Sequence, residues 1–334
     1  MRKITLVTGG LGYIGSHLIA ELSSEHSIII IDNLSNSCIE TLDKIKKLIS
    51  PREIFFYNCD LTDLDKVDSV FKKHKPNIVY HFASLKSVPE SINDPELYYS
   101  NNVIGAKNLI DLAIKYNVTK FIFSSSASVY GAPQYLPIDE SHPLNPLNPY
   151  GQNKVEIENY LQQKFNKNNS HIIVVLRYFN PVGSHPSYLI GENSKKSTNI
   201  MPILIDVAKG KRNIINIFGS DYDTEDGTCV RDYIHIMDLI DAHLKCLLIK
   251  NSGFFCINVG TGVGYSVLNL IKVFQSLIDV RINYKFTDRR NGDSPITFAS
   301  NKLAREILNW KPKFSLKKMC IDTIKYNKLK LKSE

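Results

Sequence analysis

A glycine-rich stretch near the N-terminus constrains the fold more than any other part of the chain. The apolar residues 4–7 before it indicate a buried strand, and residues 13–22 after it indicate a helix. Gly9 permits the tight turn between them, Gly12 lets an anion approach the backbone, and Gly15 lets the helix pack closely on the strand. The helix N-terminus then faces the anion. This stretch therefore predicts a cradle for the pyrophosphate of a dinucleotide cofactor.

An acidic residue follows at the distance that such a cradle requires. The second predicted strand, at residues 27–32, ends in Asp32, which lies about 20 residues past the central glycine. An acid at this position binds the hydroxyls of the adenosine ribose, and its charge would repel a 2′-phosphate. The sequence therefore favours NAD over NADP. The alternative is that Asp32 only caps the turn that follows.

Strands and helices alternate regularly through the first half of the chain. We expect strands at residues 3–8, 27–32, 53–58, 77–82, 120–125 and 171–178, and helices at residues 13–22, 39–49, 64–74, 95–116 and 150–165. Alternation at this spacing predicts an α/β fold with a Rossmann-type doubly wound parallel sheet.

The pattern loosens after residue 180. Residues 181–199 predict a long loop, and loops of that length in a compact domain are usually functional. Further on we expect a loop that reaches Asp232, helices at residues 201–209, 236–249, 267–277, 301–308 and 316–328, and strands at residues 214–218, 254–258 and 281–286. We therefore expect an NAD-binding domain at residues 1–180 and a smaller α/β substrate-binding domain at residues 181–334.

The composition excludes several classes of protein. Hydrophobic residues make up 43% of the 334 residues and charged residues 22%, as in ordinary globular chains. The six cysteines show no C-x-x-C spacing, which indicates free thiols and a cytoplasmic protein. We expect neither a signal peptide nor a membrane span. The lysines behind the net charge of +8 are scattered, apart from the C-terminus, so we expect no nucleic-acid or membrane partner.

A tyrosine and a lysine one helical turn apart carry the expected chemistry. Tyr150 and Lys154 share one face of the helix predicted at residues 150–165. The lysine ammonium, together with the positive nicotinamide ring, would stabilise the Tyr150 phenolate and make it a general base. Ser126, at the end of the fifth strand, can hydrogen-bond the same substrate hydroxyl. A Tyr-x-x-x-Lys pair alone is more often ordinary helix surface, so the prediction depends on the combination with the cradle.

Long motifs spread along the chain resemble one family. They are residues 7–17, 32–37, 81–86, 177–183, 224–228, 230–235 and 289–293. On these motifs the chain resembles the extended short-chain dehydrogenase/reductase family over nearly its whole length, and within it the UDP-sugar 4-epimerases. The resemblance implies an NAD-dependent isomerase that inverts C4 of a UDP-hexose through a transient 4-keto sugar. It also implies a homodimer and a second domain that binds the UDP-sugar.

The resemblance also implies roles for individual residues. Ser126, Tyr150 and Lys154 would be catalytic. The cofactor would contact Gly9, Gly12, Tyr13, Ile14, Asp32, Asn33, Asn36, Ser37, Asp60, Leu61, Phe82, Ala83, Lys86, Asn101, Ser124, Tyr150, Lys154 and Tyr178. The UDP-sugar would contact Lys86, Ser126, Tyr150, Phe179, Asn180, Asn199, Ile200, Asn216, Phe218, Arg231, Tyr233, Arg290, Asp293 and Thr297.

Substrate range and assembly depend on particular side chains. Thr297 stands where some relatives carry tyrosine, which extends the expected range from UDP-glucose and UDP-galactose to their N-acetyl forms. We expect no metal, because His81 and His235 each lack a second ligand at metal spacing. The helices at residues 95–116 and 150–165 would form the dimer interface through surplus apolar residues, namely Leu97, Val103, Leu109, Leu112 and Leu161.

Two alternative functions remain open on the sequence. A sugar-nucleotide 4,6-dehydratase would need an Asp-Glu pair beside the serine position, where this chain has Ala127 and Ser128. A non-catalytic NAD-sensing regulator on the same fold would have no reason to keep Tyr150 and Lys154 together.

Overall fold

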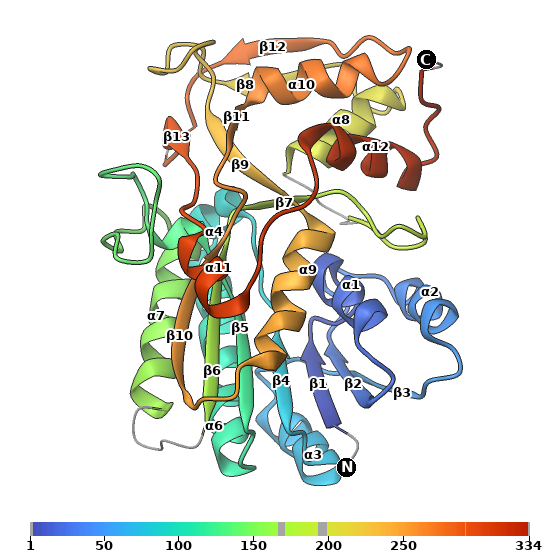
Figure 1. Cartoon of the computed structure of the whole chain (residues 1–334), viewed down its shortest axis with the longest axis vertical. Coiled ribbons are helices and arrows are strands. Elements are labelled where there is room, and N and C mark those ends of the chain that lie inside the picture. The colour runs from blue at the N-terminus through green and yellow to red at the C-terminus, as the bar shows by residue number, and fades with distance from the viewer. Residues whose placement is uncertain (1–2, 166–170, 193–198, 291, 333–334) are drawn as a thin grey trace.

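The larger layer of the protein is a seven-stranded parallel sheet. A computed structural model describes residues 3–165, 171–192, 199–290 and 292–332, so part of the loop expected at residues 181–199, and Asn291 of the last motif, lie outside the described residues. The strands run in the order β10-β6-β5-β4-β1-β2-β3, and every neighbouring pair is parallel (Figure 1). Their bounds are β1 (Lys3–Thr8), β2 (His26–Asp32), β3 (Ile54–Asn58), β4 (Ile78–His81), β5 (Lys120–Ser126), β6 (Ile172–Tyr178) and β10 (Gly253–Val259). The predicted fold class is confirmed.

Helices cover both faces of this sheet, which explains the uninterrupted apolar runs in its strands. In β2, Ile28 and Ile30 pack into one apolar cluster and Ile29 and Ile31 into the other, because successive side chains of a strand point to opposite faces. One face is covered by α1 (Tyr13–Glu21), α2 (Glu40–Ile49), α9 (Ile236–Lys245) and α11 (Lys302–Leu308). The other is covered by α3 (Leu64–His74), α6 (Gly105–Lys115) and α7 (Pro149–Phe165).

The prediction of one continuous helix at residues 95–116 is wrong. The segment forms α5 (Pro95–Tyr98), a π-helical turn η1 (Tyr99–Ile104) and then α6, and a further helix, α4 (Val88–Asn93), precedes them. The π-turn places the buried Asn102 amide against the chain after β4, where it donates to the Leu85 carbonyl and accepts from the Leu85 amide. Such π-turns often occur at functional sites, and this one holds the residues beside Lys86.

The second group of elements lies beyond the carboxyl ends of the parallel strands, at the top of Figure 1. It contains β7 (Asn180–Val182), β8 (Ile215–Phe218), β9 (Val230–His235), β11 (Gly264–Ser266), β12 (Tyr284–Thr287) and β13 (Ile296–Thr297). With them lie α8 (Ile200–Ala208), α10 (Val267–Ser276) and α12 (Leu316–Tyr326). These elements enclose an apolar cluster of their own. Strand β9 is central, because it pairs with β7, β11 and β13.

The prediction of a loop up to Asp232 is wrong, because β9 already begins at Val230. Asp232 is buried within this strand, and its carboxylate accepts hydrogen bonds from the backbone of Thr261, Gly262 and Ala299. A charged residue in a strand is tolerated when distant parts of the chain satisfy it in this way.

Segments from beyond residue 180 also complete the first sheet. Strand β10 forms its edge beside β6, and α9 packs with α1 on one face. The division of the chain at residue 180 stays a prediction. Among the described helices, none combines the length and apolar character that a membrane crossing requires.

Candidate active site

A cavity of about 350 Å³ lies at the carboxyl ends of the parallel strands and extends toward β7, β9 and α12. Open parallel sheets place their ligands at these strand ends. Every residue to which the resemblance assigns the cofactor lines this cavity, from Gly9 and Asp32 to Lys86 and Tyr178. The three proposed catalytic residues line it too. The structure therefore brings side chains from most of the chain length to one place.

The glycine turn leaves room for an anion, because any other residue at these positions would bring in a side chain. Gly9 has φ +65°, and a Cβ there would lie 2.6 Å from the Ala83 amide nitrogen. A Cβ on Gly15 would collide with the Gly9 carbonyl. Gly12, at the N-cap of α1, has no side chain to cover the first-turn N–H groups. These positions fit the pyrophosphate of a dinucleotide at a helix N-terminus.

Asp32 organises the neighbouring wall. Its Oδ2 accepts from the Leu11 amide at 3.0 Å, so the carboxylate holds the glycine turn, while Oδ1 accepts from Ser37 Oγ at 2.7 Å. Beyond it, Asn33 Nδ2 donates to Asp60 Oδ2 at 2.7 Å. Hydroxyl, amide and carboxylate groups therefore meet where the ribose and adenine of a dinucleotide would lie.

Tyr150 and Lys154 face the opposite end of the cavity. Lys154 is buried, donates to the Ser124 carbonyl at 2.8 Å, and places Nζ 5.6 Å from the centre of the Tyr150 ring. Burial lowers the pKa of Lys154 to about 7, and the nearby Glu158 carboxylate opposes that shift. Burial raises the pKa of Tyr150 to about 12, against a hydrogen bond with Ser126 that lowers it. Without cofactor, Tyr150 is thus a protonated phenol at neutral pH, and a further positive charge in the cavity would favour its phenolate.

A buried ion pair stands behind this end of the site, and the sequence analysis did not identify it. Glu158, one turn after Lys154 on α7, accepts from Arg177 Nη2 at 2.6 Å and Nε at 3.1 Å, and also from the Ser125 hydroxyl. Arg177 Nη1 donates to the Tyr130 hydroxyl at 2.9 Å. Glu158 thereby connects the helix that carries Lys154 to β5 through Ser125 and to β6 through Arg177. The detectable signal was the i, i+4 spacing of Lys154 and Glu158 on one helix face.

Glu158→Ala is expected to destabilise the cofactor-free protein by about 3–5 kcal/mol, because it leaves the buried Arg177 guanidinium unpaired. Urea unfolding measures this difference. Glu156→Ala on the same helix is the matched control, since it removes a partly exposed pair with Lys107 that should contribute no more than about 1 kcal/mol. Equal effects of the two substitutions would contradict the expected role of the buried pair.

The residues assigned to the UDP-sugar fall into two groups. Lys86, Ser126, Tyr150, Phe179, Asn180, Asn199, Ile200 and Tyr233 line the cavity. The structure does not place Asn216, Phe218, Arg231, Arg290, Asp293 or Thr297 in its lining; they lie on or near β8, β9 and β13. Strand β9 connects the groups, since Tyr233 and Arg231 are two residues apart and share one face of the strand.

Four of the six residues outside the cavity lining form two close pairs. The Arg290 guanidinium lies 4.1 Å from the centre of the Phe218 ring. Arg231 donates to the Ser294 carbonyl at 2.7 Å and lies 3.5 Å from Asp293 Oδ1. Guanidinium groups can bind a diphosphate in fork geometry, and an aromatic ring can stack on a base.

Further cavity residues were not identified from the sequence. Glu192 lines the cavity and accepts hydrogen bonds from Lys86 and Asn199.

The two histidines considered as metal ligands, His81 and His235, are both buried. His81 is hydrogen-bonded to Thr8, and His235 to Asp322. Within the described ranges, no three His, Cys, Asp or Glu side chains gather closely enough to bind a metal ion.

Comparison with known proteins agrees with the resemblance. A family model described as GDP-mannose 4,6 dehydratase matches residues 6–323. The chain is 45% identical to the UDP-glucose 4-epimerase of Bacillus subtilis (strain 168), over 95% of each chain. The crystal structure of UDP-glucose 4-epimerase from Bifidobacterium longum in complex with NAD+ and UDP is similar with a TM-score of 0.94, at 38% identity over 98% of each chain. The UDP-Glc/GlcNAc 4-epimerase of Campylobacter jejuni has a TM-score of 0.84 at 36% identity, over 98% of this chain and 99% of that one.

Proposed function

The chain belongs to the UDP-glucose 4-epimerases of the extended short-chain dehydrogenase/reductase family, and from this membership we propose that it inverts C4 of a UDP-hexose with NAD as its cofactor. One observation of the structure carries the proposal. Ser126, Tyr150 and Lys154 meet at one end of the same cavity whose other end is the glycine cradle and Asp32. The substrates are UDP-glucose and UDP-galactose, and we extend the proposal to their N-acetyl forms.

The proposed roles of the side chains follow from their positions. Tyr150 accepts the proton of the C4 hydroxyl as C4 becomes a ketone, and Ser126 hydrogen-bonds the same oxygen. When bound, NAD would supply the acceptor and donor for the C4 hydride and a positive charge beside Tyr150. Lys154 holds the strand end through the Ser124 carbonyl and places its amino group near the phenol. Tyr150 returns the proton once the sugar has turned over, so the cycle has no net redox change.

The UDP part would remain fixed while the hexose turns. We propose that Arg231 and Arg290 bind the diphosphate, that Phe218 stacks on the uracil and that Asp293 binds the ribose hydroxyls. Two contacts support this assignment: Arg290 lies over the Phe218 ring, and Arg231 lies beside Asp293. A fixed UDP and a free hexose let either face of C4 meet the same cofactor.

The two alternative functions are less well supported. The family model carries a dehydratase description, yet Ala127 and Ser128 follow Ser126 where a dehydratase needs an acid and a base. A regulator that only senses NAD would not need a buried lysine, which costs stability, beside Tyr150. Mixing the NAD-loaded protein with UDP-galactose tests the point: an enzyme develops the absorbance of reduced nicotinamide on the protein, and a sensor does not.

We propose a homodimer, through a surface that overlaps the expected one but uses other apolar residues. Val103, Leu109, Leu112 and Leu161 are buried in the core of the chain, so the reasoning from surplus apolar residues was wrong for these four. Leu97 is 47% exposed. Other large apolar side chains are exposed on the adjoining α4 and η1, namely Ile92, Tyr99 and Ile104.

We also propose a cytoplasmic location, which the free thiols of all six cysteines support.

Light scattering at micromolar concentration should give twice the mass of one chain, because apolar side chains gathered on one face favour association. Leu97→Glu should shift the protein toward the monomer by placing a charge on that face. Leu248→Glu is the control, since Leu248 is 72% exposed but lies on the far side of the sheet, after α9. A monomeric wild-type protein would refute the proposed dimer.

A further inference from the structure

Residues 183–192 lead from β7 along the cofactor cavity, and we call this segment the strap. Its last three residues, Ile190, Gly191 and Glu192, line the same cavity as Gly12 and Asp32. The strap is therefore one of the parts of the second group of elements that reach this cavity.

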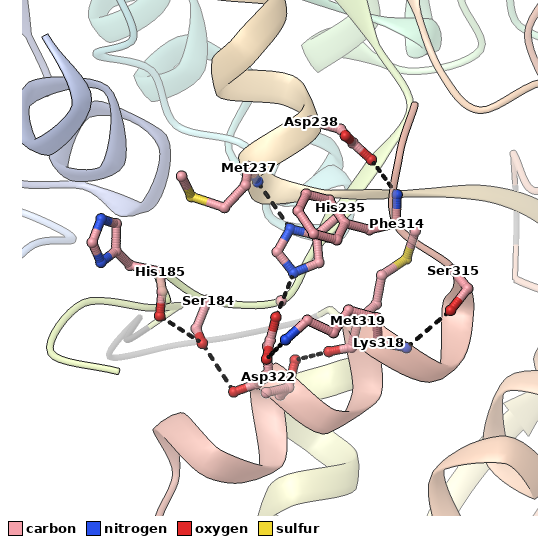
Figure 2. A network of polar contacts seen from close by, with 12 residues as sticks. Ser184, His185, His235, Met237, Asp238, Phe314, Ser315, Lys318, Met319 and Asp322 are labelled. Atoms are coloured by element: carbon pink, nitrogen blue, oxygen red, sulfur yellow. Dashed lines mark hydrogen bonds and ion pairs between the residues drawn. The ribbon is translucent and has the colours of Figure 1, made fainter. Parts of the chain in front are cut away.

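The near end of the strap is firmly attached. Gly183 has φ +100°, its carbonyl accepts from the Tyr13 hydroxyl at 2.8 Å, and a Cβ there would lie 2.7 Å from His235 Nε2. Ser184 Oγ donates to the Asp322 carbonyl at 2.9 Å (Figure 2). These contacts fix where the strap starts.

Asp322 on α12 gathers the contacts around this attachment. Its carboxylate lies 3.0 Å from His235 Nε2 and 2.7 Å from Lys318 Nζ, as Figure 2 shows. It also accepts from the Tyr188 hydroxyl at 3.2 Å, which fixes the middle of the strap to the same residue. Asp322 therefore anchors the strap to α12 and β9 together.

The far end of the strap meets the opposite wall of the cavity through an ion pair. Glu192 Oε1 accepts from Lys86 Nζ at 3.1 Å and from Asn199 Nδ2 at 2.6 Å, and its side chain is only 8% exposed. Lys86 belongs to the chain after β4, which Asn102 holds in place. Gly191 fits under the Tyr326 ring, where a Cβ would lie 2.5 Å from the nearest ring carbon. The pair thus joins two walls that come from opposite sides of the cavity.

We propose that Glu192 retains NAD in the protein by closing the strap across the cofactor through its ion pair with Lys86. The inference rests on the proposed function, because a hydride that must return to the same sugar requires the same cofactor to stay bound. The carboxylate cannot act by contacting the pyrophosphate, since two anions repel. The Glu192 carboxylate acts through Lys86. When it is paired with Lys86, it holds the strap in place. Without that pair, its negative charge would oppose binding of the cofactor.

Glu192→Gln tests this directly, because it removes the charge and keeps the size of the side chain. NAD-loaded protein is diluted rapidly, and the NAD released through a filter is measured over time. We expect release about tenfold faster than from the wild-type protein, the size expected for a charged hydrogen bond. Activity lost on dilution should return when NAD is added. Asp68→Asn is the matched control, because it breaks a lysine–carboxylate pair with Lys115 far from the cavity.

A second variant covers the case in which Glu192→Gln fails to fold. Tyr188→Phe frees the middle of the strap from Asp322 and leaves the cavity lining unchanged, so its NAD release should also be faster than in wild type, though by a smaller factor. Equal release from wild type and both variants would overturn the inference, and so would slower release from Glu192→Gln. A wild-type protein that never binds NAD would instead overturn the proposed function, and the inference with it.

Discussion

Tyr150→Phe should lower kcat by about 10²–10⁴-fold while NAD stays bound, the range that general acid–base catalysis commonly contributes. The substitution removes the phenolic oxygen and keeps the ring that packs at the cavity wall. Burial raises the pKa of Tyr150 to about 12, so the phenol is protonated at neutral pH without cofactor, and the positive charge of bound NAD would favour its phenolate. Initial rates with UDP-galactose measure the effect, and NAD released on denaturation shows that the cofactor is still present.

Tyr160→Phe is the matched control for this prediction. It lies on the same helix and removes a hydroxyl that donates to Asp111 on the surface, so turnover should not change. Near-normal turnover of Tyr150→Phe would refute its assignment as the base. Loss of bound NAD from that variant would show instead that the ring is needed for cofactor binding.

Thr297→Tyr should abolish turnover of UDP-N-acetylglucosamine, with a loss of at least about 100-fold in kcat/KM, and spare UDP-glucose. Thr297 lies on β13 and pairs in register with Arg231 of β9, the proposed diphosphate ligand. The resemblance puts Thr297 beside the sugar C2 substituent, where a threonine would leave space that a tyrosine ring would fill. Such steric exclusion is an efficient way to reject a larger analogue. Paired assays with the two sugars measure the difference.

Thr297→Val is the control, since it keeps the shape of the side chain and should process both sugars. Two results would contradict the assignment of Thr297 as the residue that limits substrate size. In one, the wild-type protein rejects the N-acetyl sugar, which would mean that Ser84, in the motif at residues 81–86, or the loop expected at residues 181–199 already fills the space. In the other, Thr297→Tyr loses both activities equally.

The parallel sheet could be predicted because its signals are local. Each central strand is a short apolar run buried on both faces, and the glycine turn fixes where the first helix starts. The helix at residues 95–116 was mispredicted for the opposite reason. Its interruption at η1 serves the contact between Asn102 and Leu85, which no local pattern reveals. Strand β9 was missed because the burial of Asp232 depends on Thr261 and Ala299, far along the chain.

The candidate site divides in the same way. Asp32 and Tyr150 could be proposed as site residues from the sequence, and both line one cavity of the structure. Glu192 could not, because its importance lies in a contact with Lys86, more than 100 positions earlier in the chain. Glu158 is a similar case: its i, i+4 spacing from Lys154 was visible in the sequence, but its pairing with Arg177 of β6 was not.

The central claim is that one chain takes a hydride from C4 and returns it to the same carbon. The most direct measurement is incubation of the NAD-loaded protein with UDP-galactose in deuterated water, followed by NMR of the product. We predict UDP-glucose that carries its original hydrogen at C4 and no deuterium there, with no NADH in solution. A 4-keto-6-deoxy product, or deuterium at C4 of the glucose, would contradict the account.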